Sequence, residues 1–337
     1  MPTHADARPL QARDDAAKAT VRGRSVEHGK SASATRVRRV LPTADIDDAP
    51  HAGAASVWRK IRATRRLLGV LVWSIIGCTT QTILVRLRGP SKIWFARFFW
   101  RTTCRLIGLE IRIEGALAGT IRDRAAVARG ERPVIFVANH SSWLDIPAIG
   151  SVLPTVFVAK DEVGRWPIMG TISRLGRTIF VSRQRNNTGR ELSEMTNRLA
   201  DGDNLILFPE GTSSDGGRVL PFLSSFFAIA KPGRLDARAL QTTDAIPAVP
   251  PVVIQPVSVV YDRLEGLPVS RSRRSVFSWY GDMDLAPHVW KFCQWRNTRA
   301  TVILHPPLYP DAFRTRKALA NEAWRVISDG AADLRHR

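Results

Sequence analysis

The sequence predicts an α/β domain with a mainly parallel sheet flanked by helices, preceded by a basic, apolar helical segment and a disordered N-terminal tail. From residue 109 onward, short apolar runs alternate with amphipathic stretches, which is the pattern of strands and helices in α/β folds. Residues 57–108 contain the most apolar run of the chain among many basic residues. Residues 1–56 have almost no hydrophobic periodicity. We therefore predict three parts in 337 residues: a tail (1–56), a helical segment (57–108) and an α/β domain (109–337).

The net charge indicates an anionic partner. The formal net charge is +20 and the pI is about 11.2. Such a charge is typical of proteins that bind nucleic acid, an acidic membrane surface or acidic substrates. Cys78, Cys104 and Cys293 are far apart and have no histidine at metal-ligand spacing, so we predict neither a zinc site nor a disulfide framework. From the first residues of the sequence, which have no basic stretch followed by an apolar one, we expect no cleavable signal peptide.

The charge is concentrated in the helical segment. Residues 1–56 carry nine Lys or Arg against seven Asp or Glu. Residues 57–112 carry twelve Lys or Arg against one acid, Glu110, and this net +11 is more than half of the total. We therefore expect the anionic partner at this segment.

This segment has the composition of a membrane-binding element. Leu67 to Val85 is a run of nineteen residues without charge, just long enough to cross a hydrocarbon core of about 30 Å. Both flanks are basic, whereas a single span normally has most nearby Lys and Arg on one side. The symmetric flanks favour a helix that enters one leaflet and returns.

The following stretch, residues 91–111, interleaves aromatic residues with arginines at helical spacing. This is typical of a helix that lies in the headgroup layer, where each basic residue adds roughly 1 kcal/mol of attraction to an anionic leaflet. One alternative is a buried core helix with a solvated basic face. Another is a nucleic-acid groove, which is disfavoured because the basic residues surround a long uncharged run.

Six apolar runs then predict strands. LEIRIEG alternates, whereas RPVIFVAN, TVFVAK, DNLILFPEG, PVVIQPVSVVY and RATVILHPPL are continuous, as in strands buried on both faces of a sheet. RNNTGRELSEMTNRLADG predicts a helix that ends near Gly202 as its C-cap. In such sheets, ligands bind outside the carboxyl ends of the strands.

A histidine and an aspartate stand at one of these strand ends. In VANHSSWLD, His140 follows the strand and Asp145 comes five residues later. If Ser142 begins a helix, Asp145 lies in its first turn and can accept a hydrogen bond from the His140 ring. Such a pair makes a general base for activating a hydroxyl, typically worth about 10²–10⁴-fold in rate. The alternative is a capped turn with an incidental histidine.

Four blocks together resemble the glycerolipid acyltransferase family, whose best-known members are the 1-acylglycerol-3-phosphate acyltransferases. The blocks NHSSWLD, GRTIFVSR, FPEGTSS and IQPVSV occur in this order, and the resemblance runs from about residue 106 to the C-terminus. It implies an α/β fold and direct transfer of an acyl group from acyl carrier protein or coenzyme A to a lysolipid hydroxyl. His140 is then the base and Asp145 its orienting partner, without a serine or cysteine nucleophile.

The resemblance also implies a set of substrate-binding residues. Lys160 and Arg183 match cationic positions near an acceptor phosphate. Two positions depart from the family pattern, because Ser213 replaces an arginine and Ser182 replaces an aspartate. A lost guanidinium removes a bidentate phosphate clamp, for which Arg218 is a replacement. The full predicted set is Asn139, Lys160, Arg183, Glu210, Gly211, Thr212 and Arg218.

Two acceptors fit these residues. We predict lysophosphatidate as the main acceptor, giving phosphatidic acid in phospholipid biosynthesis, because Lys160 and Arg183 are retained. The variant EGTSSDG, with WYGDMDLAPHVW downstream, resembles the branch that includes acyltransferases of lyso-ornithine lipid. That acceptor carries an amine and a carboxyl group instead of a phosphate, and it is the alternative.

Two further histidines, His288 and His305, are interpreted as structural. Trp279, Tyr280, Asp282 and His288 suggest either a second site or an aromatic loop, and the loop is favoured. His305 precedes two prolines and is interpreted as a strand-end residue.

The expected partners are membrane lipids, a lysolipid, and acyl carrier protein or acyl-CoA as co-substrate, with no nucleic acid, no metal and no further cofactor. The expected location is the cytoplasmic face of a membrane, the inner membrane in a bacterium. A non-enzymatic alternative is a basic membrane-binding scaffold with an inactive acyltransferase domain. Only an enzyme needs His140, Asp145 and Glu210 together, and all three are present. A metal-dependent hydrolase would need a further His or carboxylate cluster, which the sequence lacks.

Overall fold

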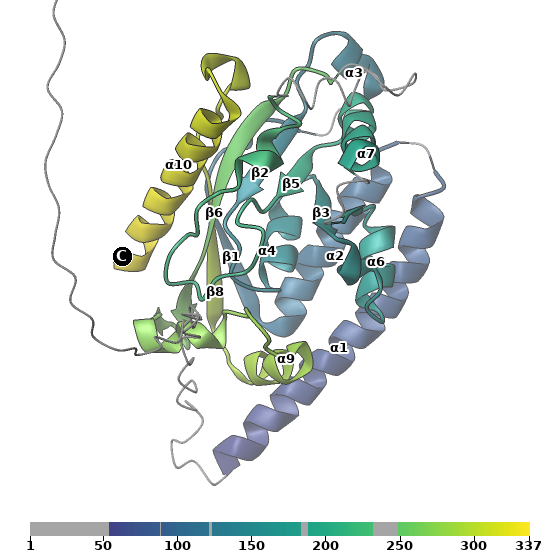
Figure 1. Ribbon diagram of the computed structural model, residues 1–337. Coiled ribbons are helices and arrows are strands. Elements are labelled where there is room, and N and C mark those ends of the chain that lie inside the picture. Colours follow the sequence, from purple (N-terminus) through teal and green to yellow (C-terminus); the bar gives the residue numbers. More distant parts are fainter. Residues whose placement is uncertain (1–53, 88, 121–122, 183–187, 232–248) are drawn as a thin grey trace, which may run out of the picture. The chain divides into compact units, whose positions relative to one another are not determined.

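The computed structural model describes residues 54–337 except 88, 121–122, 183–187 and 232–248 (Figure 1). The predicted tail, residues 1–56, therefore lies almost entirely outside the described residues. The first described helix begins at Ala54, close to the boundary expected at residue 57.

The described strands form one eight-stranded sheet in the order β1-β8-β6-β2-β5-β3-β4, with β7 paired to β6. All pairs are parallel except those of β6 with β8 and with β7. The prediction of a mainly parallel sheet is thus confirmed. The strands are β1 (Leu109–Gly115), β2 (Val134–Ala138), β3 (Val156–Lys160), β4 (Ile179–Val181), β5 (Leu205–Leu207), β6 (Val253–Leu264), β7 (Leu267–Pro268) and β8 (Thr298–Leu304).

The sheet is covered on both faces, which explains its continuous apolar runs (Figure 1). Alternate residues of β2 belong to two core clusters. Phe136 lies in the cluster with α1, α2, α4 and α9, whereas Val137 lies in the cluster with α7 and α10. These helices are α1 (Ala54–Leu84), α2 (Ser91–Ile107), α4 (Asp145–Val152), α7 (Thr188–Ala200), α9 (Leu285–Gln294) and α10 (Arg316–His336).

The other helical elements are short. They are α3 (Arg124–Ala128), α5 (Asp161–Gly164), α6 (Met169–Leu175) and the 3₁₀ helices η3 (Ser224–Phe227), η4 (Arg271–Val276) and η5 (Pro310–Ala312). Gly202 follows α7 with φ of 91°, in the left-handed region expected at a helix C-terminus.

The helical segment predicted at residues 57–108 forms α1 and α2. The indole of Trp73 donates to the Phe99 carbonyl (3.1 Å) and stacks on the Phe99 ring, which joins the two helices. α1 is long and apolar enough to cross a membrane, but only 17% of its apolar window is buried against the protein. The alternative of a buried core helix therefore does not describe α1.

Large apolar side chains cover the free surface of this pair. Exposed apolar patches of this kind mark contacts with a membrane or another protein. The exposed residues of the two helices are Val57, Trp58, Ile61, Leu68, Leu71, Val72, Ile75, Ile76, Ile83, Trp94 and Phe98, and Leu87 is exposed in the connection between them.

Candidate active site

His140 lies two residues beyond the buried strand β2, at the carboxyl edge of the sheet. Asn139 ties this strand end to β6, because its amide donates to the Val259 carbonyl (2.9 Å) and accepts from the Val259 N–H (2.8 Å). The side chain of Asn139 is buried and both its polar atoms bind β6. These two hydrogen bonds fix Asn139, and with it the backbone position of the neighbouring His140.

His140 and Asp145 form the pair that the spacing predicts. The His140 Nδ1 lies 2.8 Å from Asp145 Oδ2, and the same oxygen accepts the N–H groups of Ser141 (2.7 Å) and Ser142 (2.9 Å). The Asp145 side chain is fully buried, whereas that of His140 is 20% exposed. With Nδ1 held by the carboxylate, Nε2 is the ring nitrogen left for a substrate.

The start of helix α4 differs from the expectation that the helix begins at Ser142. Helix α4 begins at Asp145 rather than at Ser142, and Leu144 occupies its N-cap position without a side-chain hydrogen bond. The turn between β2 and α4 is instead stabilised by the Asp145 carboxylate, which accepts hydrogen bonds from the backbone N–H groups of Ser141 and Ser142. One carboxylate thus shapes the turn and orients the histidine.

Tyr261 is a member of the site that sequence reasoning missed. Its hydroxyl donates to Asp145 Oδ1 (2.5 Å), so both oxygens of this buried carboxylate are satisfied. Burial and the adjacent Asp145 charge raise the pKa of Tyr261 well above its usual value. The residue lies in β6, more than a hundred positions from Asp145, and only the pairing of β2 with β6 brings the two together.

Glu210, in the loop after β5, binds the backbone of His140. Its carboxylate accepts the His140 N–H (2.7 Å) and the Leu220 N–H (2.9 Å). Burial raises the pKa of Glu210 to about 7, although both backbone bonds oppose this shift. In the same loop, Phe208 stacks on the His140 ring at 4.5 Å, and the Ser214 N–H donates to the His140 carbonyl (2.9 Å).

Four of the other predicted binding residues, Lys160, Gly211, Thr212 and Arg218, lie in the described part of the chain. Lys160 ends β3 half-buried, and Arg218 is exposed in the loop after the Glu210 motif. Neither side chain forms a hydrogen bond or ion pair within the described part of the chain. Gly211 has φ of 69° and Thr212 is exposed. Arg183 lies outside the described residues.

His288 and His305 have structural partners. His288 is buried in α9, and its Nδ1 accepts the indole N–H of Trp143 (3.0 Å). His305 Nε2 lies 2.8 Å from the Ser258 hydroxyl. A Cβ at Gly330 would lie 2.4 Å from the His305 ring, so α10 packs tightly over it. These contacts fit the structural interpretation of both residues.

Comparisons with known proteins identify the family of this chain. A family model described as Acyltransferase matches residues 120–260. The lyso-ornithine lipid O-acyltransferase of Rhizobium meliloti is 36% identical over 235 residues, covering 69% of this chain and 72% of that protein. The corresponding enzyme of Brucella abortus is 36% identical, covering 71% of this chain and 82% of that protein. This chain belongs to the glycerolipid acyltransferase family. As an acyltransferase of this family, it is an enzyme.

Two further comparisons concern lysophosphatidate enzymes. The 1-acyl-sn-glycerol-3-phosphate acyltransferase of Neisseria gonorrhoeae is 36% identical over 101 residues, covering 29% of this chain and 38% of that protein. The crystal structure of the 1-acyl-sn-glycerophosphate acyltransferase PlsC from Thermotoga maritima covers 82% of this chain and 98% of that one, with a TM-score of 0.50 and 23% identity. The second comparison supports the fold of this acyltransferase.

The role of Tyr261 leads to a testable prediction. In Tyr261→Phe, the buried Asp145 loses one partner, so we expect the free energy of unfolding to fall by about 1.5–3 kcal/mol, as for a hydrogen bond to a charged group. We also expect a lower kcat with little change in KM, because Asp145 is less well held. Chemical denaturation and steady-state kinetics measure both. Tyr309→Phe, which removes an exposed hydroxyl, is the control; equal effects in the two variants would refute the role.

Proposed function

We propose that this enzyme is a lyso-ornithine lipid O-acyltransferase, which transfers an acyl group from a thioester donor to the free hydroxyl of the lipid. The supporting observation is the extent of similarity to enzymes with that name. Those enzymes match over 72% and 82% of their length, whereas the lysophosphatidate enzyme of Neisseria matches over 38%. This reverses the order of the two acceptors expected from the sequence, where lysophosphatidate came first.

The proposed reaction starts at His140 Nε2. This nitrogen takes the proton of the acceptor hydroxyl while the hydroxyl oxygen attacks the thioester carbonyl carbon. Asp145 stabilises the imidazolium that forms, because its buried carboxylate lies 2.8 Å from Nδ1. The pair is oriented before substrate binds, since Ser141, Ser142 and Tyr261 already hold the carboxylate.

The tetrahedral intermediate then collapses. The carbon–sulfur bond breaks, the new ester bond remains, and the thiolate takes the proton from the imidazolium. Histidine and carboxylate return to their starting charge states without a covalent acyl-enzyme. The thiols of Cys104 and Cys293 are buried, and burial raises their pKa to about 12 and about 11, which suits neither to a nucleophilic role.

The acceptor preference is proposed to depend on Ser213. This residue lies in the loop that follows Glu210, next to Ser214, whose N–H and hydroxyl both donate to the His140 carbonyl. A serine here has no charge for a phosphate, whereas an arginine would form a bidentate contact. A head group without phosphate, such as ornithine, does not need that contact.

The lipid is proposed to reach the site from α1 and α2. Their exposed apolar side chains suit insertion into one leaflet, and their basic residues suit anionic headgroups. The donor, acyl carrier protein or acyl-CoA, is proposed to come from the cytoplasmic side.

The acceptor is tested with purified enzyme, one acyl donor and two lipids. We expect a higher kcat/KM for lyso-ornithine lipid than for lysophosphatidate. In Ser213→Arg, the ratio should shift toward lysophosphatidate by about one to two orders of magnitude, because a charge-assisted contact is worth about 1.5–3 kcal/mol. Ser272→Arg adds the same charge at an exposed position of η4 and is the control. A wild-type preference for lysophosphatidate would overturn the proposed acceptor.

A further inference from the structure

Two loops beside the candidate active site expose large apolar side chains. The first joins α5 to α6 and carries Trp166 and Ile168, which are 37% and 62% exposed. The second lies between η4 and α9 and carries Trp279 and Met283, of which Met283 is 37% exposed. The rings of Trp166 and Trp279 meet edge to face with their centroids 6.2 Å apart, so the two loops contact each other. We call these four residues the apolar rim.

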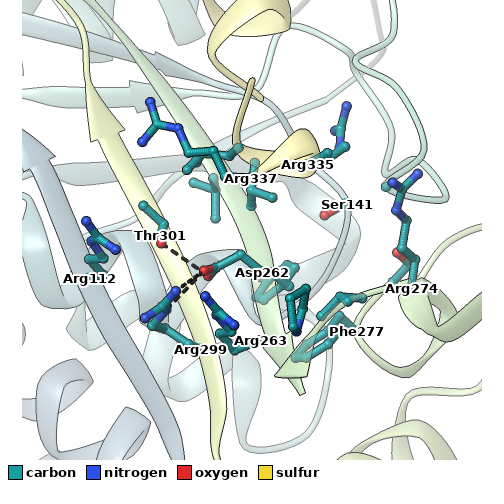
Figure 2. A pocket seen from close by; sticks show the side chains of 18 of the residues that line it. Arg112, Ser141, Asp262, Arg263, Arg274, Phe277, Arg299, Thr301, Arg335 and Arg337 are labelled. Atoms are coloured by element: carbon teal, nitrogen blue, oxygen red, sulfur yellow. Dashed lines mark hydrogen bonds and ion pairs between the residues drawn. The ribbon is translucent and has the colours of Figure 1, made fainter. Parts of the chain in front are cut away.

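Hydrogen bonds connect the apolar rim to the candidate active site. The Trp279 N–H donates to the Ser141 carbonyl (2.9 Å), and the Ser141 N–H donates to Asp145 Oδ2 (2.7 Å). The Trp279 indole donates to the Met283 carbonyl (2.8 Å), which closes the second loop. Figure 2 shows Ser141 and Phe277, two residues before Trp279, on the wall of one pocket. The rim therefore borders the turn that carries the candidate base.

The two loops lead into helices that are attached to α1, the helix that the proposed function places at the membrane. The Gln81 amide of α1 donates to the Leu175 carbonyl at the end of α6 (3.2 Å). The Arg66 guanidinium of α1 donates to the Cys293 carbonyl in α9 (3.0 Å). Both helices therefore lie against α1 (Figure 1). Because α6 has seven residues, Ile168 at its start lies about 10 Å from the contact of Leu175 with α1.

Ile168 has a backbone conformation that isoleucine rarely adopts. Its φ is 63° and its ψ is −58°, and the Met169 N–H donates to the Pro167 carbonyl (2.6 Å). Ile168 is thus the central residue of a γ-turn of the strained kind, which is unfavourable for a β-branched side chain. The turn nevertheless exposes this side chain, where it gains no packing within the protein. Strain and exposure together indicate that Ile168 has a contact outside the chain.

The composition of the apolar rim suits the boundary between lipid headgroups and acyl chains. Tryptophan is enriched at this depth of a membrane, because its ring is apolar and its indole N–H is polar. Charged residues flank the rim, since Arg165 precedes Trp166, and Asp282 and Asp284 enclose Met283, all three with exposed side chains. Charges are costly in the hydrocarbon core, so these residues limit insertion of the rim to the headgroup level.

We propose that the apolar rim is a second membrane contact, which lies at the headgroup level while α1 and α2 insert more deeply. The proposal rests on the membrane approach of the proposed function and does not depend on the acceptor or on the base. A membrane that touches the protein at both places lies against the edge of the candidate active site. The acceptor hydroxyl then reaches His140 while the acyl chain of the lipid stays in the leaflet, so the apolar chain does not cross water.

A fluorescent probe at the apolar rim tests this contact directly. In full-length Cys78→Ser, where the two remaining cysteines are buried, Ile168→Cys or Met283→Cys is labelled with an environment-sensitive fluorophore. The matched control is Tyr309→Cys, which is also exposed but lies at the amino end of β6. Each protein is diluted from detergent onto preformed vesicles of phosphatidylcholine and phosphatidylglycerol with bromine on the acyl chains.

We expect the brominated lipid to quench both rim probes and the membrane to protect them from iodide in the water. Iodide should quench the control probe. If iodide quenched the rim probes as strongly as the control, the rim would not touch the membrane and the proposal would be wrong. The measurement needs no substrate, so a wrong acceptor or a wrong base leaves it valid.

Kinetics separate the membrane contact from the chemistry. In Trp166→Ser/Ile168→Ser, the ratio of kcat/KM for a lysolipid in vesicles to kcat/KM for its short-chain, water-soluble analogue should fall about tenfold, because apolar area is lost from the membrane contact. Ile168→Gly should lower the same ratio and raise the melting temperature, since glycine relieves the positive φ. Tyr309→Ser should change neither quantity. A higher melting temperature of Ile168→Gly with an unchanged ratio would contradict a role of Ile168 at the membrane.

Discussion

Acyl transfer should fall by at least about 10²-fold in His140→Ala, because the reaction loses the base that takes the acceptor proton. The fold should persist, since the ring is held by one hydrogen bond to Asp145 and by stacking on Phe208, and its side chain is 20% exposed. In this variant, the Asp145 carboxylate still accepts hydrogen bonds from the N–H groups of Ser141 and Ser142. Steady-state turnover with a saturating donor, together with a melting curve, gives both quantities.

The control for this variant is His336→Ala, which removes an exposed histidine at the end of α10. It should leave turnover and melting temperature unchanged. Near-normal turnover in His140→Ala would rule out the proposed base. A variant that loses turnover and also melts at a much lower temperature would show that His140 supports the fold.

Two substitutions of Asp145 are expected to differ in a way that depends on its contacts. In Asp145→Asn, the oxygen of the amide should occupy the Oδ2 position, because three N–H donors point at it and an NH₂ group cannot replace it there. The NH₂ group then faces the Tyr261 hydroxyl, which can turn to accept. The ring stays oriented, but the imidazolium loses its negative partner, so we expect kcat to fall by about 10²-fold.

In Asp145→Ala, the three N–H donors and the Tyr261 hydroxyl lose their acceptor in a buried position. We expect turnover to be abolished and the free energy of unfolding to fall by about 3–5 kcal/mol, the range for removing one partner of a buried charged pair. Asp161→Asn, at a partly exposed acid paired with Arg165, is the control and should change neither quantity. If Asp145→Asn lost as much stability as Asp145→Ala, the amide oxygen would not have replaced Oδ2 in these hydrogen bonds, and this account of the contacts would be wrong.

The strands were predictable because a strand that is buried on both faces of a sheet has a continuous run of apolar residues. The runs at β2, β3 and β6 are continuous and apolar, and the structure places them inside one sheet covered by helices on both sides. The order of strands was not predictable, since pairing partners such as β6 and β8 or β1 and β8 are set by packing between distant segments. The antiparallel pairing of β6 with β8 also has no local signature.

The candidate site also contains one part that the sequence predicts and one part that only the fold brings together. His140 and Asp145 are five residues apart, so a single turn brings them together, and their spacing alone predicts the pair. Glu210 was expected in the site from its motif, but its contact with the His140 N–H depends on how the loop after β5 meets the end of β2. Tyr261 reaches the same turn from β6, and nothing near it in the sequence marks Asp145 as its partner.

By itself, the sequence determined the α/β class, the basic apolar segment and the identity of the candidate base, because each depends on residues that are neighbours along the chain. Only the tertiary structure decided which groups hold Asp145 and that α1 leaves most of its apolar surface uncovered. The physical reason is that charge compensation and burial are properties of contacts across the fold. Net charge along a segment shows how many cations are present, whereas their distances to carboxylates after folding decide which of them remain free for a ligand.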